Sequence, residues 1–286
     1  MTPVLLSVLI PAYNQSAGVE RILARLTDLG APGEIEIRVS DDSTDDAAAA
    51  RIAAAVQALP SPDFSRRHYQ RNQPALGAVR NWNVLLTQAT GRYIWLLHHD
   101  EEPDAAACLA PLLAELRSDT AEVWILRCRV QHQPGQRPRL HFPPRWAAAL
   151  LHRWPGYLLR RNLIGPPSAL IVRDHAVVRY DESLVWLVDV EAYVRLLASA
   201  NRIAAWPQAG VLSRVDDVHS ITAVLRPQLA ATARRELDQL AMGVLQTQAE
   251  PWAARTPRSS VLRATETLLW LAWRVGQRLL VRATPP

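Results

Sequence analysis

The sequence predicts an α/β fold, with a mostly parallel mixed sheet flanked by helices and a helical extension at the C-terminal end. Over the first hundred residues, short apolar runs alternate with helical patterns, as they do where crossover helices join parallel strands. After about residue 226 the strand patterns stop, and two helical stretches follow at 228–246 and 260–282. We therefore expect a main domain over residues 1–225 and an extension over residues 226–286.

Each element of the main domain follows from its own pattern. Apolar runs predict strands at residues 4–10, 35–40, 67–70 and 92–97. Apolar periodicity or alanine-rich composition predicts the helices between them, at 18–29, up to residue 59 and at 76–89. Gly30 and Pro32 end the first helix, and Asp42 opens a polar run that offers N-cap oxygens to the second. Further on, we expect helices at 108–116 and 190–200, strands at 122–130 and 169–172, and a loop at 131–144.

The composition is that of an ordinary folded protein, with 49% hydrophobic and 21% charged residues. All 32 basic residues are arginine, which together with abundant alanine indicates a GC-rich, bacterial genome. The arginines are scattered through the sequence without a nucleic-acid-binding motif, so nucleic acid is not an expected partner. Cys108 and Cys128 lack metal-ligand spacing. Because we find no signal peptide and no apolar run long enough to span a membrane, we expect a cytoplasmic protein.

Polar side chains follow three of the expected strands. They lie in the runs Pro11-Ala12-Tyr13-Asn14, Ser40-Asp41-Asp42-Ser43 and His98-His99-Asp100-Glu101. The carboxyl ends of parallel strands meet at one edge of a sheet, where nucleotides bind in open α/β folds. Amide and carboxylate groups suit a base, and Asp100 could hold a divalent cation beside a diphosphate. The alternative is a solvated polar turn, and Glu101 and Glu102 are expected to begin the next helix.

Residues 7–14, followed by residues 39–45, resemble the opening of the inverting family-two glycosyltransferases with the GT-A fold. Similar runs stand at 80–83 and 89–93, and the resemblance covers about the first 220 residues. It implies a nucleoside diphosphate sugar as donor, with uridine or thymidine diphosphate both suitable, and Mg²⁺ or Mn²⁺ as cofactor. The donor-binding residues that we expect are Pro11, Ala12, Tyr13, Asn14, Asp41, Asp42, Arg80, His98 and His99.

The metal-binding Asp-x-Asp motif of that family aligns with His98-His99-Asp100. Its second acid is kept, so the resemblance makes Asp100 the metal ligand, while His98 departs from the pattern. His98 and His99 either contact the ligands directly or flank them. His219 lies in a late loop where some relatives supply a histidine to the metal or the diphosphate. A plain surface histidine is the alternative for His219.

The resemblance also implies a catalytic base, an acid near the start of a helix. The matching acid is Asp189, with Val188 where the family has a preceding Glu. Glu191 is the fallback base, and a first-turn acid favoured by the helix dipole is the alternative role for Asp189. Residues 165–168 resemble the acceptor-side loop of the family.

These features together predict an inverting glycosyltransferase that acts in surface polysaccharide or glycolipid assembly, on a carbohydrate or lipid-linked acceptor. Two alternatives stay open: a degenerate sugar-nucleotide-binding or scaffold protein, and a nucleotidyltransferase. The helix expected at 260–282 is amphipathic. It packs onto the main domain or onto a second subunit of a homo-oligomer, or it attaches the protein peripherally to the inner face of the cell membrane.

Overall fold

The structure is a computed structural model of the 286-residue chain. It describes residues 3–27, 33–60, 66–104, 109–131, 135–173, 178–214 and 226–247. The strands are β1 (Leu6–Ala12), β2 (Ile35–Asp41), β3 (Arg67–Arg71), β4 (Tyr93–Leu96), β5 (Glu101–Pro103), β6 (Val123–Gln131), β7 (Arg139–Leu140), β8 (Leu170–Arg173) and β9 (Ile203–Arg214). The helices are α1 (Ser16–Thr27), α2 (Asp46–Gln57), α3 (Ala78–Gln88), α4 (Leu109–Ser118), α5 (Pro144–Arg153), α6 (Val188–Ser199) and α8 (Leu229–Thr247).

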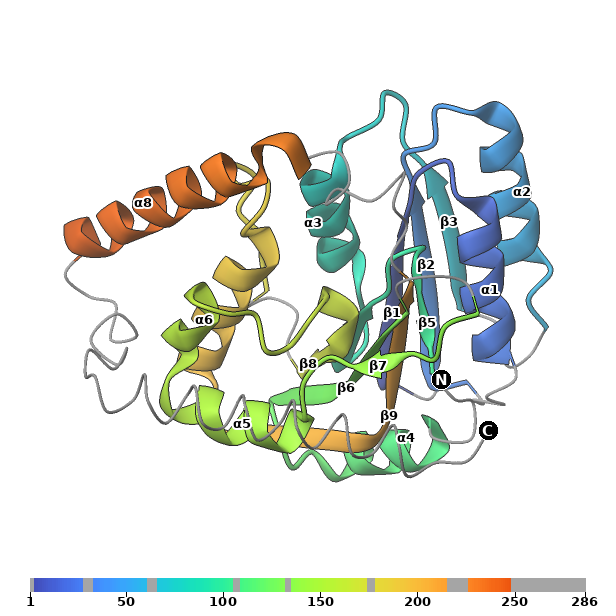
Figure 1. Ribbon diagram of the computed structural model, residues 1–286. Coiled ribbons are helices and arrows are strands. Elements are labelled where there is room, and N and C mark those ends of the chain that lie inside the picture. The colour runs from blue at the N-terminus through green and yellow to red at the C-terminus, as the bar shows by residue number, and fades with distance from the viewer. Residues whose placement is uncertain are drawn as a thin grey trace.

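One mixed sheet with the strand order β3-β2-β1-β4-β8-β6-β9-β5 forms the centre of the molecule, and β7 pairs with β6 at its side. Helices flank the sheet, and α8 extends away from it on the side of α3 and α6 (Figure 1). This architecture confirms the α/β class that the sequence predicts.

The first half of the sheet is parallel. β1 pairs in parallel with β2 and with β4, and β2 pairs in parallel with β3. Every residue of β1 is buried, because α1 and α2 lie on one side of these strands and α3 lies on the other (Figure 1). The register places Leu6 beside both Ile35 and Tyr93, so the carboxyl ends of β1, β2 and β4 meet at one edge, as expected.

The second half of the sheet contains both parallel and antiparallel strands. Its strand β9 and the helix α5 were not predicted from the sequence. β8 runs antiparallel to β4 and β6, whereas β9 runs parallel to β6. Pro207 and Gly210 interrupt the strand pattern of β9, and the ladder shifts register opposite Leu126 and Arg127. The short strand β7 lies within the expected loop at 131–144 and pairs with β6.

The prediction that a helix begins at Glu101 and Glu102 was wrong. Both residues lie in β5, which pairs with β9 and places Glu101 opposite Ser213. A partner strand more than a hundred residues away in the chain therefore overrides the local preference for a helical first turn. Successive strand residues point to opposite faces. Glu102 binds Arg214 at 2.6 Å on one face, and Glu101 faces the cavity described below on the other.

The start of the C-terminal extension packs onto the main domain. In α8, the side chains of Thr232 and Glu236 are buried, and Leu237 packs against the core. The amphipathic helix expected at 260–282 lies outside the described residues, and the boundary at residue 225 stays a prediction. Within the described part of the chain, no helix combines the length and apolar character that crossing a bilayer requires.

Candidate active site

A cavity of about 1170 Å³ opens at the carboxyl edge of β1 and β4. Its wall combines the turns that follow these strands with the start of α3, the segment 158–167 before β8, the start of α6 and one face of α8. Segments far apart in the sequence thus contribute to a single wall, since the sheet brings its carboxyl ends together. The volume is in the range of sites for small molecules and cofactors.

Several of the expected donor-binding residues line this cavity. Pro11, Ala12 and Tyr13 line it where β1 ends, and the ring of Tyr13 is 51% exposed. Asp42 also lines it, with its carboxylate held by the Asn72 side chain and the Gly77 backbone N–H, both at 2.8 Å. An exposed ring beside an oriented carboxylate is a plausible surface for a nucleoside, because a base can stack on the ring and donate to the acid.

Three expected donor-binding residues have other surroundings. The side-chain oxygen of Asn14 accepts from the backbone N–H groups of Thr44 and Asp45, each at 3.0 Å. The carboxylate of Asp41 accepts from the Ser43 backbone N–H and from the Tyr69 hydroxyl. Arg80 is exposed on α3 and is absent from the cavity lining. Asn14 and Asp41 therefore shape the loop after β2 from behind the cavity wall.

A cluster of three side chains in the turn between β4 and β5 could hold a metal ion. His98, Asp100 and Glu101 each offer one ligand atom, and these atoms lie within 4.8 Å of one another. One imidazole and two carboxylates suit Mn²⁺, and carboxylate oxygens also suit Mg²⁺. The Nε2 atom of His98 is buried without a hydrogen-bond partner in the described part of the chain, which is consistent with a missing ligand.

The surroundings of His98 fix its position and its charge. Its ring lies 4.6 Å from the Trp82 ring, centroid to centroid, and its backbone N–H donates to the Glu101 carboxylate at 3.1 Å. Burial lowers the pKa of His98, but the carboxylates of Glu101, Asp100 and Asp189 outweigh burial and raise the pKa above its usual value. These carboxylates therefore stabilise a positive charge at this position, on the protonated ring or on a bound cation.

Helix α1 supports this turn from behind. A Cβ atom on Gly18 would lie 2.1 Å from the backbone oxygen of His99, far closer than real contacts allow. Only glycine fits at this position without displacing the turn. The sequence signal for this packing was a glycine early in an otherwise apolar helix, which pattern analysis alone does not connect to His99.

Asp189 lines the same cavity, in the first turn of α6 and within electrostatic range of His98 and Glu101. Its Oδ1 accepts from the backbone N–H of Val190 at 2.8 Å, and its Oδ2 accepts from the side-chain amide of Asn162 at 3.2 Å. Burial raises the pKa of Asp189 to about 6, against the lowering effects of the Val190 backbone N–H and the charge on His98. The carboxyl still keeps some access to the cavity. An acid with such a pKa can take up a proton near neutral pH.

Asn162 is a site residue that the sequence analysis did not identify. Its Oδ1 accepts from the backbone N–H groups of Ile164 and Gly165, and its amide donates to the carbonyl of Gly165 and to Asp189. Gly165 has φ +99°, a conformation that only glycine adopts readily. An asparagine three residues before this glycine was the available signal, since asparagine commonly bonds to backbone groups in turns.

The C-terminal extension also reaches the site, through Glu236 of α8. Its buried carboxylate accepts four hydrogen bonds of 2.8–3.3 Å from the backbone N–H groups of Val185, Trp186 and Leu187. These residues line the cavity and lead directly into α6. Glu236 therefore fixes the segment from which Asp189 projects, and no local sequence pattern identifies it. The described residues end before His219 and resume after it, so its expected role stays a prediction.

The chain is similar to known proteins in sequence and in structure. The model of the family described as glycosyl transferase family 2 matches residues 7–181. An uncharacterized protein of Mycobacterium tuberculosis (strain CDC 1551 / Oshkosh), MT1568, is 31% identical over 214 residues, which are 68% of this chain and 62% of that protein.

Solved structures of S. aureus TarS share the fold. TarS 1-349 in complex with UDP-GlcNAc aligns with a TM-score of 0.59 at 18% identity, over 77% of this chain and 61% of that one. The complex of TarS 1-349 with UDP aligns with a TM-score of 0.56 at 19% identity, over 75% of this chain and 61% of that one. These likenesses confirm the expected GT-A-type fold. The chain spans about three fifths of the length of the relatives that it matches.

Proposed function

This chain belongs to glycosyl transferase family 2, and on that premise we propose that it moves a sugar from a nucleoside diphosphate sugar to an acceptor hydroxyl with inversion. The observation that carries the proposal is the shared cavity, which both Asp189 and the cluster of His98, Asp100 and Glu101 line, within electrostatic range of each other. A base and a diphosphate site in one cavity suit a displacement at an anomeric carbon held between them.

Asp189 is the proposed base. The acceptor oxygen forms a bond to the anomeric carbon, the bond from that carbon to the diphosphate oxygen breaks, and the hydroxyl proton passes to the Asp189 carboxylate. Asn162 and the Val190 backbone N–H orient this carboxylate. Its pKa of about 6 supports the role, because at neutral pH the acid is mostly ionised and still basic enough to accept a proton.

Asp100, with His98 and Glu101, is the proposed site for Mg²⁺ or Mn²⁺, which would stabilise the charge of the departing diphosphate as a Lewis acid. Tyr13 and Asp42 are the proposed contacts to the nucleoside. Since TarS 1-349 was solved with UDP-GlcNAc and with UDP, a UDP-sugar is the first donor to test, and dTDP-sugars follow. For the acceptor we propose a carbohydrate or lipid-linked hydroxyl in surface polysaccharide or glycolipid assembly.

The test is release of nucleoside diphosphate from UDP-GlcNAc and other nucleotide sugars in the presence of Mn²⁺, with donor binding followed by calorimetry. Asp189→Asn should lower turnover by about 10²–10⁴-fold, the usual contribution of a general base, while donor binding is kept. Glu191→Gln is the matched control on the same helix, because the Glu191 carboxylate binds Arg195 at 2.9 Å instead of lining the cavity.

Four outcomes would overturn the proposal or part of it. Near-native turnover by Asp189→Asn would remove Asp189 as the base, and a large loss in Glu191→Gln would transfer the role to that residue. Donor binding with no turnover under any condition would favour a degenerate binding protein. Release of pyrophosphate would favour a nucleotidyltransferase.

A further inference from the structure

The positive charge of this chain is concentrated in one stretch. Residues 123–173 contain nine of the 32 arginines and none of the 27 acids. The remainder of the chain therefore carries more acids than arginines, although the whole protein has a formal charge of +5. Local excess charge of one sign matters for association, because it acts on any charged surface that the protein meets.

Some of these arginines form ion pairs with acids of the described residues. Arg127 and Arg129 both bind the buried carboxylate of Asp104, and Arg173 binds Asp119 and Glu122. In contrast, Arg145 and Arg153 of α5 are exposed, and no carboxylate of the described residues lies within ion-pair distance of either. Within the described part of the chain, their charge is therefore not neutralised by an acid.

Helix α5 presents these arginines together with tryptophan on one face. Its buried side includes Ala147 and Leu151, which pack into the core. The outward side consists of Arg145, Trp146, Ala149, His152 and Arg153, which we call the α5 face. The side chain of Trp146 is 47% exposed, which is unusual for so large an apolar group.

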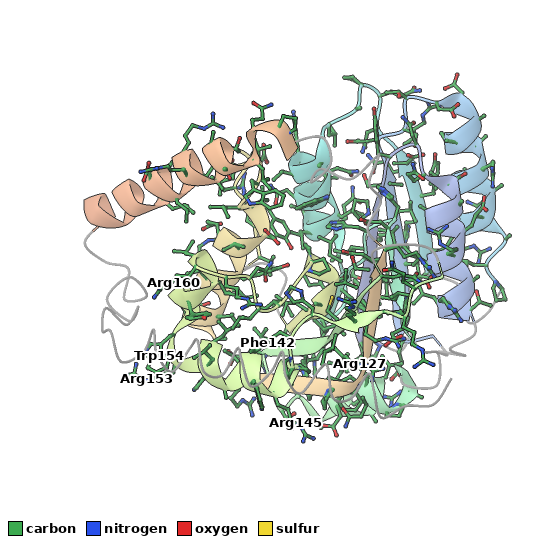
Figure 2. The ribbon with its side chains drawn as sticks, viewed as in Figure 1. Arg127, Phe142, Arg145, Arg153, Trp154 and Arg160 are labelled. Atoms are coloured by element: carbon green, nitrogen blue, oxygen red, sulfur yellow. The ribbon has the colours of Figure 1, made fainter. Side chains whose placement is uncertain are left out.

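Aromatic rings at both ends of α5 are held in place. The ring of Trp146 meets that of Phe142 edge to face, with centroids 6.4 Å apart. The guanidinium of Arg153 lies 5.7 Å from the centroid of the Trp154 ring. Figure 2 shows Arg153, Trp154 and Arg160 together at one edge of the molecule, with Arg145 projecting below α5. Arginine and tryptophan in such proximity suit a lipid headgroup region, where the rings enter the interface and the cations meet phosphates.

We propose that the α5 face docks the protein onto the surface of an anionic bilayer. Charge complementarity selects this partner, and the exposed Trp146 supplies the apolar contact that a purely ionic partner would not need. Nucleic acid is less suitable, because the face is a single three-turn helix with two exposed arginines and not an extended basic groove. This interaction goes beyond the proposed sugar transfer, and it involves none of the residues assigned to that reaction.

A short segment of chain connects helix α5 to the wall of the cavity. The chain leaves α5 through Trp154 and continues into residues 158–162, which line the cavity wall. Arg160 belongs both to this wall and to the exposed basic edge. A surface that binds α5 would therefore be joined to one part of the cavity wall through residues 154–162.

Co-sedimentation of the full chain with vesicles tests the proposal, in the absence of any donor sugar so that the result is independent of catalysis. The vesicles contain phosphatidylcholine alone or phosphatidylcholine mixed with phosphatidylglycerol. We expect binding only to the mixed vesicles, weakened by salt. Because an arginine near an anionic surface contributes about 1 kcal/mol, Arg145→Gln with Arg153→Gln should reduce the partition coefficient about 30-fold. Trp146→Ala should also weaken binding to the mixed vesicles, and it should do so at every salt concentration.

The matched control is Arg25→Gln with Arg80→Gln, which removes the same charge from exposed positions on α1 and α3, away from α5 (Figure 1). The control should bind like the native chain. Absence of binding to the mixed vesicles would overturn the proposal, as would equal binding by the α5 variant or equal losses in both variants. Binding of a labelled oligonucleotide that the α5 variant loses, without vesicle binding, would identify nucleic acid as the partner instead.

Discussion

The side-chain amide of Asn162 donates a hydrogen bond of 3.2 Å to the carboxylate of Asp189. The same asparagine closes the turn that ends at Gly165, so one side chain connects the loop before β8 to the acid at the start of α6. A hydrogen bond to a carboxylate stabilises its ionised form. Asn162 therefore opposes the burial that raises the pKa of Asp189.

The pH dependence of transfer should follow the ionisation of Asp189. Because the ionised form is the proposed base and its pKa is raised to about 6, kcat/KM should fall tenfold per pH unit below that value and level off above it. Initial rates of nucleoside diphosphate release at saturating Mn²⁺ provide the measurement. A profile that stays flat from pH 5 to 8 would contradict the assignment.

Asn162→Ala should move that profile to higher pH. Loss of a hydrogen bond to a charged group is worth about 1.5–3 kcal/mol, so the midpoint should rise by about one pH unit or more. Tyr193→Phe is the matched control, because the Tyr193 hydroxyl donates to the same Gly165 carbonyl without bonding to Asp189. If Tyr193→Phe shifts the pH profile as far as Asn162→Ala does, the effect comes from the turn at Gly165 and not from the hydrogen bond between Asn162 and Asp189.

Asp189→Asn should stabilise the fold at alkaline pH. The pKa of Asp189 is raised on folding, so its stabilising contribution is complete below the unfolded value of 3.8 and is lost as pH rises through about 6. At pH 8 the ionised carboxyl costs at most about 3 kcal/mol, less where cavity water reaches it. Urea unfolding at pH 8 should therefore show the variant to be the more stable protein, and the difference should shrink toward pH 4. An advantage that is independent of pH would be evidence against this cause.

Glu101→Gln should weaken Mn²⁺ binding, whereas Glu102→Gln should not. The two acids are neighbours in β5, but only Glu101 contributes a ligand atom to the cluster with His98 and Asp100. Removing one carboxylate from a small metal site should lower Mn²⁺ affinity by about tenfold or more. Calorimetric titration of both variants with Mn²⁺ makes the comparison. Equal affinities in the two variants would place the metal elsewhere.

Glu236→Gln should lower both turnover and stability. The neutral side chain keeps the shape of Glu236 but loses the charge that strengthens its bonds to the N–H groups of residues 185–187. We expect a loss of about 1–2 kcal/mol in the free energy of unfolding. We also expect a lower kcat, since the segment before Asp189 becomes less ordered. Asp238→Asn, an exposed acid one position past Leu237 on the same helix, should change neither quantity.

The fold was largely predictable from local sequence patterns. The elements that were predicted wrongly or not at all have physical reasons in common. The buried strands β1, β2 and β4 and the helices between them follow from apolar periodicity, because helices on both sides of the sheet demand it. β5 was misassigned and β9 was missed, since β5 is defined by its pairing with β9, and β9 by its pairing with β6 and β5, and neither by its own composition. Helix α5 was obscured by the two prolines at its start, which suggested a loop.

By itself, the sequence determined the α/β class, the edge at which the polar strand ends meet, and Asp100 and Asp189 as candidate residues. Only the tertiary structure decided which of the neighbouring groups face the cavity. It directed Glu101 to the cavity and Glu102 to Arg214 on the other face, used Asn14 and Asp41 to brace a loop, and brought Asn162 and Glu236 to Asp189 and the segment before it. The physical reason is distance along the chain. Periodicity reports burial within one element, whereas these contacts join elements tens to more than a hundred residues apart.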